Sequence, residues 1–411
     1  MIMRVARRKL SNWPWHTLLW IGALGSIVGM RLFIPSCWDL AVYQQAMKSL
    51  RDGLDPYVVG QARQIAEHAR GRIACTYVYP PLTTVILRIL NYIPALPGRL
   101  LYWTVYAAGF GAQLWAASHL ARPWERKLMR YLLPVAVFFP GLIPNEVILS
   151  GNVAIPLYGA VWAGAIRGWK LERWGWFYAA VLAASLFKLP LLTLLAIPVL
   201  MGAAQFINSV MTAAGGLGLF FVQRLIWPKE FAEYLSDVQM QFTLNHDFGR
   251  GPAGMLGHAL YSMGRPFTAA STFFYLAYGA LIFCVLANFC RMYRREEVDG
   301  CSWMTVLLTG TILLNPRIMS YDALALTVPM MLLVVRGWQD AVGRWCLFAG
   351  VVATTCAYTA GQDNAGDAML MVSVFVAGVY GLLKEARSAA VAPFPEAAGT
   401  PVALYGSQTT E

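Results

Sequence analysis

The first candidate for chemistry is an aspartate that directly follows a long apolar stretch. Asp39 lies in the sequence Trp38-Asp39-Leu-Ala-Val-Tyr43, just after the apolar residues 17–35. If that stretch crosses a membrane, the Asp39 carboxylate lies at the membrane edge, where partial desolvation makes it more basic. Such a group can act as the general base that takes a proton from a hydroxyl. The alternative interpretation is an aspartate that caps a helix beginning near Leu40.

Two further motifs follow in the same polar segment. They are Gly53-Leu-Asp55-Pro56-Tyr57 and Tyr77-Val-Tyr79-Pro80-Pro81. The first is by itself only a turn signal, and the second can simply start a helix, because proline is tolerated in a first turn. Both motifs follow Asp39 in this order, and Asp39 itself follows one apolar span with a basic flank. This combination identifies a type of protein far more specifically than any one of the motifs does.

Three basic residues lie where positive charge is normally scarce. Lys188 lies in Phe-Lys-Leu-Pro between two apolar runs, Arg317 follows an Asn-Pro pair, and Arg250 lies in a glycine-rich stretch. Basic residues are depleted in segments outside a membrane, and an ionisable group held at membrane depth is a functional candidate. The alternative for Lys188 is a lysine that snorkels from a helix end.

Polar residues also interrupt the apolar pattern at the turn 144–152, which contains Glu146 and Asn152. Broken backbone at membrane depth is tolerated where it lines a polar cavity. We expect Glu146 to bind hydroxyl groups of a ligand or to assist Asp39. The alternative is that Glu146 only caps the next helix.

A late polar pair, Tyr321-Asp322, is a candidate for binding hydroxyl groups of a ligand. The alternative is a structural ion pair between Asp322 and Arg317, and this pairing is the interpretation that we favour.

A second polar segment contains Asn-His246-Asp-Phe-Gly-Arg250-Gly and has the composition of a lid over a site. A solvated connecting loop is the alternative. The spacings of His246 with Arg250, and of Asp52 with Asp55, are too sparse to predict a metal site. The sequence therefore predicts an enzyme that works without a metal.

The composition shows which elements must hold these residues. Of the 411 residues, 58% are hydrophobic and 13% charged, whereas soluble domains carry about a quarter charged residues. The 32 Lys and Arg residues exceed the 21 Asp and Glu residues, but they cluster in short loops beside apolar runs, so nucleic acid is not an expected partner. The sequence predicts an all-α polytopic membrane protein. Cys37 and Cys75 flank one polar segment and form either a disulfide or two free thiols.

We expect about 12 transmembrane helices with both termini in the cytoplasm. Residues 17–35 form the first. Residues 81–94 are too short to cross and contain Arg88 and Asn91, so they are expected to lie in the outer interface. The remaining spans are expected near 98–119, 129–143, 152–168, 175–187, 189–203, 207–227, 268–290, 301–314, 320–336, 344–358 and 367–384.

This topology leaves two large external segments, 39–97 and 228–267. Residues 1–387 are expected to form a single transmembrane domain. The tail 388–411, rich in Ala, Pro, Ser and Thr, is expected to be a disordered cytoplasmic extension.

Taken together, the motifs resemble those of glycosyltransferase family 87. This family uses polyprenyl-phosphate sugars, has the GT-C fold and includes the mycobacterial phosphatidylinositol-mannoside mannosyltransferases. The resemblance covers about residues 38–333. It rests on these elements: Asp39 with Tyr43, the Asp-Pro-Tyr motif, the Tyr-Pro-Pro motif, Gly151-Asn152, Lys188, and Asn315-Pro316 before Tyr321-Asp322. Members usually carry Gly-Gln-x-Asn where this chain has Ser150-Gly151-Asn152.

The resemblance implies an inverting enzyme that moves a sugar, most often mannose, from a polyprenyl-phosphate donor to a hydroxyl of a lipid-linked or glycan acceptor. The reaction would take place at the outer face of the inner (cytoplasmic) membrane, in a lipid-embedded monomer without a cofactor. Asp39 is then the general base, and the donor phosphate contacts Lys188, Arg317 and Arg250. Substrate contacts are expected from the remaining candidates: Tyr43, Asp55, Tyr57, Tyr79, Glu146, Asn152, His246, Tyr321 and Asp322.

A secondary transporter or a lipid-carrier flippase is the alternative function. Transporters commonly consist of two halves with matching hydropathy. This chain instead has one large external segment after its first span, with nothing comparable half a chain later. The lopsided pattern therefore favours the transferase.

Overall fold

The computed structural model describes residues 17–25, 38–72, 74, 76–136, 147, 150–265 and 269–391. Every regular element in these ranges is a helix, which confirms the predicted all-α class. Three residues of the sequence analysis, Glu146, Cys37 and Cys75, lie outside the described ranges. The last helix continues to Val391, and the single transmembrane domain with a disordered tail stays a prediction.

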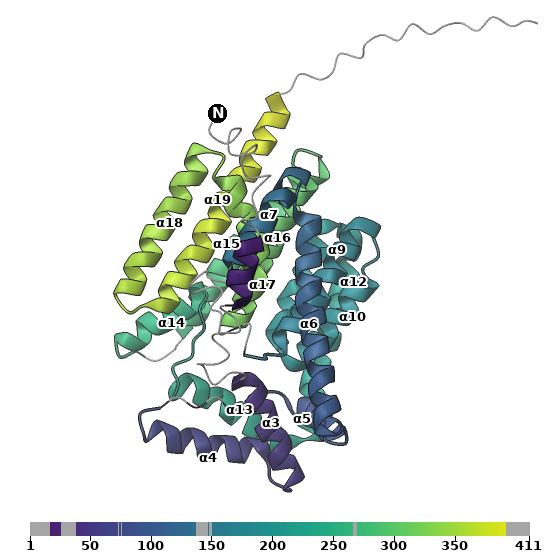
Figure 1. Ribbon diagram of the computed structural model, residues 1–411, viewed down its shortest axis with the longest axis vertical. Helices are drawn as coiled ribbons and strands as arrows, with labels where there is room; N and C mark the ends of the chain where they lie inside the picture. The colour runs from purple at the N-terminus through teal and green to yellow at the C-terminus, as the bar shows by residue number, and fades with distance from the viewer. Residues whose placement is uncertain are drawn as a thin grey trace, which may run out of the picture.

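A layer of four short helices, here called the cap, lies at one end of a bundle of longer helices (Figure 1). The cap consists of α3 (Trp38–Arg51), α4 (Pro56–His68), α5 (Pro81–Leu90) and α13 (Pro228–Thr243). Prolines in the first turns of α4, α5 and α13 start these helices, since a first-turn residue needs no hydrogen-bond donor. Three of these helices lie in the segment 39–97, where residues 81–94 were expected to form an interfacial helix, whereas α13 lies in the segment 228–267, for which no helix was expected.

The bundle has two sides (Figure 1). One side contains α6 (Ala95–Leu120), α9 (Ala154–Leu171), α10 (Gly175–Phe187), η2 (Leu189–Leu195), α11 (Ala196–Met201), η3 (Ala203–Gln205) and α12 (Phe206–Ile226). The other contains α7 (Pro123–Ala136), α14 (Pro252–Ser262), α15 (Ala269–Arg294), α16 (Gly300–Leu313), α17 (Ser320–Gly337), α18 (Ala341–Thr359) and α19 (Asp363–Val391).

Five helices of the described residues, α12, α15, α17, α18 and α19, are long and apolar enough to cross a membrane. The predicted spans 175–187 and 189–203 are shorter helical pieces, because α10 ends at Lys188 and Pro190 opens a new 3-10 turn. The chain is therefore an all-α protein with membrane-spanning helices, and the number of about 12 spans stays a prediction.

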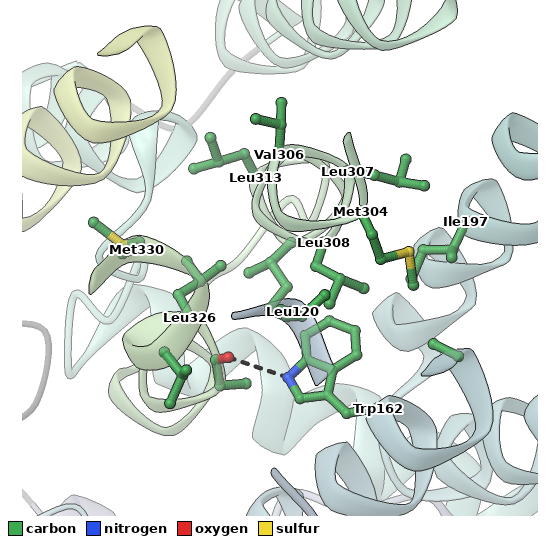
Figure 2. Packing of buried hydrophobic residues seen from close by; sticks show 14 of the residues in the cluster. Leu120, Trp162, Ile197, Met304, Val306, Leu307, Leu308, Leu313, Leu326 and Met330 are labelled. Carbon is green, nitrogen blue, oxygen red and sulfur yellow. Dashed lines mark hydrogen bonds between the residues drawn. The ribbon is translucent and has the colours of Figure 1, made fainter. Parts of the chain in front are cut away.

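Helix α16 forms the centre of the bundle, and all of its residues from Ser302 to Leu313 are buried. Figure 2 shows Trp162 of α9 packed in this core, where its indole N–H donates a hydrogen bond to the Ala325 carbonyl at 3.1 Å. Helices α6 and α9 cross closely: a Cβ atom on Gly159 would lie 2.1 Å from the Gly109 carbonyl oxygen. Only glycine permits this approach, as in other tightly packed membrane helices.

The end of the bundle away from the cap is held together by ion pairs. Arg336 binds Glu125 through two hydrogen bonds of 2.7 and 2.8 Å, and both side chains are almost completely buried. Arg122 binds Asp299 and Glu385 nearby. Removing one partner of such a buried ion pair lowers the free energy of unfolding by about 3–5 kcal/mol. These contacts join several of the basic segments that the sequence places on one side of a membrane.

Candidate active site

The candidate site lies where the cap meets the bundle. Asp39 is in the first turn of α3, where its backbone N–H and that of Leu40 donate to the Ser150 carbonyl at 3.1 and 3.2 Å. Gly151 has a positive φ of 69°, and a Cβ atom there would lie 3.0 Å from the Leu40 Cβ. Ser150 and Gly151, at the end of the turn that the sequence indicates before α9, therefore pack directly against the helix that carries Asp39.

Asn152 in this turn is 1% exposed. Its side-chain oxygen accepts a hydrogen bond of 2.8 Å from the Ala154 N–H and so caps the start of α9. Its Nδ2 group has no hydrogen-bond partner in the structure. A buried donor left unpaired costs about 1–3 kcal/mol, so Asn152 keeps a donor that a ligand can satisfy.

Three predicted tyrosines gather in the cap. The Tyr43 and Tyr79 hydroxyls lie 2.6 Å apart, and the Tyr57 hydroxyl donates to the Tyr79 carbonyl at 2.7 Å. Burial raises the pKa of all three, and the Asp39 charge raises the pKa of Tyr43 and Tyr79 further. They are therefore neutral phenols at neutral pH. Because the Tyr43 hydroxyl also accepts from the Val153 N–H at 3.3 Å, this group ties the cap to the bundle.

Asp55 takes a structural position. Its carboxylate accepts a hydrogen bond of 2.9 Å from the Tyr57 N–H and caps α4. It also lies beside Glu233 of α13, and burial together with this neighbour raises the pKa of Glu233 to about 7. Burial likewise raises the pKa of Asp237, one turn further along α13, to about 7.

The sequence analysis overlooked these two acids of α13. Their spacing with Glu230, at intervals of three and four residues, places Glu230, Glu233 and Asp237 on one helix face. This acidic face is the sequence signal from which a shared site for Glu233 and Asp237 could have been predicted. In the described residues, no group of three or more His, Cys, Asp or Glu side chains is arranged to hold a metal ion.

The favoured pairing of Asp322 with Arg317 is wrong. Asp322 is 1% exposed, and its Oδ1 atom lies 3.5 Å from the Lys188 Nζ atom. The other oxygen accepts a hydrogen bond of 2.8 Å from the Met319 N–H and caps α17. Asp322 therefore pairs with the lysine that follows α10, whereas Arg317 pairs with a different carboxylate. Lys188 also lies 3.5 Å above the centre of the Tyr321 ring, a cation–π contact.

The other two predicted cations are paired as well. Arg317 binds Asp247, with 2.7 Å between its Nη2 atom and the carboxylate, and its Nε–H donates to the Asp247 carbonyl at 3.1 Å. Arg250 binds Asp367 at 2.8 Å. Asp367 is fully buried and accepts a second hydrogen bond from the Tyr358 hydroxyl. All three candidate phosphate ligands thus have a carboxylate partner.

The glycine-rich loop 245–251 packs against the turn 315–319. The Arg250 N–H donates to the Ile318 carbonyl at 2.6 Å, and a Cβ atom on Gly249 would lie 2.9 Å from the same oxygen. His246 has a positive φ of 51°, and its ring stacks on Tyr261 of α14 at 3.8 Å. The loop is therefore attached to the bundle rather than freely solvated.

Asp39, Lys188 and Arg317 all lie beside the cap. Leu40, which follows Asp39, and Phe187, which precedes Lys188, pack against the same buried cluster of cap residues. The Arg317 guanidinium lies 5.0 Å from the centre of the Phe242 ring of α13. A carboxylate able to accept a proton and two cations able to bind an anion therefore share one region between the cap and the bundle. This arrangement suits a reaction in which a hydroxyl loses a proton while a negatively charged group leaves.

Comparison with models of known protein families shows a match for this chain. The model of glycosyltransferase family 87 matches residues 77–316, which is more than half of the chain. The matched region includes Tyr79, Asn152, Lys188 and Arg250, and it begins after Asp39. A search of the curated proteins gave no match.

Proposed function

Because the chain belongs to glycosyltransferase family 87, we propose that it transfers a sugar, mannose in the first instance, from a polyprenyl phosphate to a hydroxyl of a lipid-linked or glycan acceptor. Asp39 is the general base of this reaction. The observation that supports the proposal is the position of Asp39 at the junction of cap and bundle: its N–H bonds to the Ser150 carbonyl, and the chain neighbours of Asp39 and Lys188, Leu40 and Phe187, pack against one buried cluster.

The chemistry needs few groups. As the acceptor oxygen attacks the anomeric carbon, its proton passes to the Asp39 carboxylate and the new C–O bond forms. The bond from that carbon to the phosphate oxygen breaks, and the polyprenyl phosphate leaves with the bonding electron pair. Attack from the face opposite the leaving group inverts the anomeric centre. Cations near the interface, with Lys188 and Arg317 foremost, stabilise the departing phosphate.

The remaining candidates divide into two groups in this proposal. Asn152 offers its unpartnered amide to a sugar hydroxyl, and Tyr321 and Asp322 hold Lys188 in position. For Asp55, Tyr57 and Tyr79 we propose a supporting role, since their polar groups bond within the cap, and the same role for Tyr43, whose hydroxyl bonds Tyr79 and the Val153 N–H.

We place the site on the outer side of the inner membrane, with about 12 passes of the chain. The direction of the helices supports this topology: α10 ends at the cap side with Lys188, whereas α17 begins there and ends with Arg336 in the ion-pair cluster. The ion-pair cluster contains basic loops, which are retained in the cytoplasm.

The direct test uses purified enzyme in detergent with a panel of labelled polyprenyl-phosphate sugars and extracted membrane lipids as acceptors. We expect glycolipid product from the mannosyl donor, and a loss of about 10²- to 10⁴-fold in turnover for Asp39→Asn. Asp52→Asn, an exposed acid just after α3, is the matched control and should keep the wild-type rate. Wild-type turnover by Asp39→Asn would show that Asp39 is not the base.

A further inference from the structure

The three carboxylates that neutralise the candidate phosphate ligands differ in how firmly they are held. Asp367 and Asp322 are 0% and 1% exposed, and each accepts a second hydrogen bond, from the Tyr358 hydroxyl and the Met319 N–H. The side chain of Asp247 is 33% exposed. Of the three partners, only Asp247 therefore lies on a solvent-accessible loop surface.

We propose that Asp247 is a counter-ion which holds Arg317 until the donor phosphate arrives and then exchanges with that phosphate. Asp247 is in this sense a positioning residue that acts through Arg317. The inference rests on the proposed function, because it needs a phosphate ligand, and it adds a step that the family assignment does not contain.

The contacts of Arg317 favour such an exchange. Its backbone is held independently of the ion pair, since its N–H donates to the Asn315 side chain at 3.0 Å. Its guanidinium packs 5.0 Å above the Phe242 ring. The side chain is 26% exposed, so a phosphate oxygen can replace the carboxylate without moving the arginine. A guanidinium binds phosphate and carboxylate with the same planar geometry.

The backbone of Asp247 is held in place, so the exchange concerns its side chain. The Asp247 N–H donates to the Gln241 carbonyl at 3.1 Å, and the Asp247 carbonyl accepts from the Arg317 Nε–H at 3.1 Å. Further along, the Arg250 N–H bond to Ile318 and the Arg250–Asp367 pair hold the loop end in place. Only the Asp247 carboxylate has to turn away from the guanidinium, while Arg250 stays beside the site.

The test compares donor binding by wild-type enzyme, Asp247→Asn and Asp247→Glu. The probe is a short-chain polyprenyl phosphate mannose, and binding is measured directly as well as through the donor KM. Because Asp247→Asn removes the competing charge, we expect donor affinity to rise by about two- to fivefold, the range for a partly exposed ion pair. Asp247→Glu keeps the charge and should keep the wild-type affinity. A merely structural role predicts the opposite sign, since losing the pair would misplace Arg317 and weaken binding.

A double variant separates the causes. In an Arg317→Gln background, Asp247→Asn should no longer change donor affinity. The proposal is overturned if Asp247→Asn tightens donor binding in the Arg317→Gln background. It is also overturned if the single Asp247→Asn variant binds the donor more weakly than wild-type enzyme. If wild-type enzyme binds no polyprenyl-phosphate sugar, the proposed function itself is wrong and the inference fails with it. If wild-type enzyme binds the donor and Asp247→Asn leaves the affinity unchanged, only the inference fails.

A second measurement needs no variant. Hydrogen exchange of residues 246–248 in wild-type enzyme should become faster when the polyprenyl phosphate product is added, because the loop loses its carboxylate contact to Arg317 and opens more often. Slower exchange in this segment on adding the product would overturn the proposal even if Asp247→Asn did not fold.

Discussion

The Lys188 ammonium group lies 3.5 Å from the Asp322 carboxylate, at a point where the ends of α10 and α17 meet below the cap. Asp322 is almost inaccessible to solvent and Lys188 is 17% exposed. The pair therefore joins two distant parts of the chain and holds the ammonium group between Asp322 and the Tyr321 ring. This geometry is the starting point for the first prediction.

Replacement of Lys188 by Met should raise the KM for the polyprenyl-phosphate donor about tenfold or more, which corresponds to one lost hydrogen bond to a charged group. Turnover at saturating donor should change less. Because Asp322 loses its partner, the variant should also unfold at a lower temperature, and Lys188→Arg should restore part of both properties. Lys48→Met, an exposed lysine of α3, is the control. An unchanged donor KM would make Lys188 a residue that only supports the fold.

Replacement of Tyr57 by Phe should destabilise the cap without altering substrate recognition. The change removes the hydroxyl that donates to the Tyr79 carbonyl and leaves that buried oxygen with one bond fewer, at a cost of about 1–2 kcal/mol. A lower thermal midpoint with an unchanged donor KM is the expected result. Tyr92→Phe serves for comparison, since Tyr92 is 89% exposed. If the KM rises while the midpoint stays constant, Tyr57 contacts substrate after all.

The acids of α13 should make stability depend on pH. Asp237 is fully buried and its two oxygens have no hydrogen-bond partner in the structure. The pKa values of Asp237 and Glu233 are about 7 in the folded protein, against ordinary values of 3.8 and 4.5. The folded state therefore binds more protons than the unfolded state between these limits, and stability falls as the pH rises through about 7.

Thermal unfolding between about pH 5 and pH 8 measures this effect. Wild-type enzyme should lose stability toward the alkaline end of this range. There the carboxylates of Asp55, Glu233 and Asp237 are all ionised and repel one another across α4 and α13. Asp237→Asn imitates the protonated acid and should show a smaller loss. Asp52→Asn should follow the wild-type curve. Identical curves for wild-type and Asp237→Asn would mean that Asp237 does not carry this proton.

The sequence by itself determined the helical class and most helix positions. Long apolar runs must form helices, because a backbone surrounded by hydrocarbon has to satisfy its own hydrogen bonds. Prolines at 56 and 81 mark two helix starts for a similarly local reason. The motif order was also enough to indicate family 87, which the family model confirms. Asp39 as the base stays a prediction.

Only the tertiary structure decided which charges meet. Asp322 follows Arg317 closely in the sequence. In the structure one oxygen of its carboxylate accepts from the Met319 N–H, and the other lies beside Lys188. Likewise, the pKa of Asp237 depends on burial against α4, which lies far away in the sequence. Local rules of helix formation act over a few residues. The partner and the solvation of a side chain depend on which distant segments pack around it, and the sequence pattern contains no direct record of that packing.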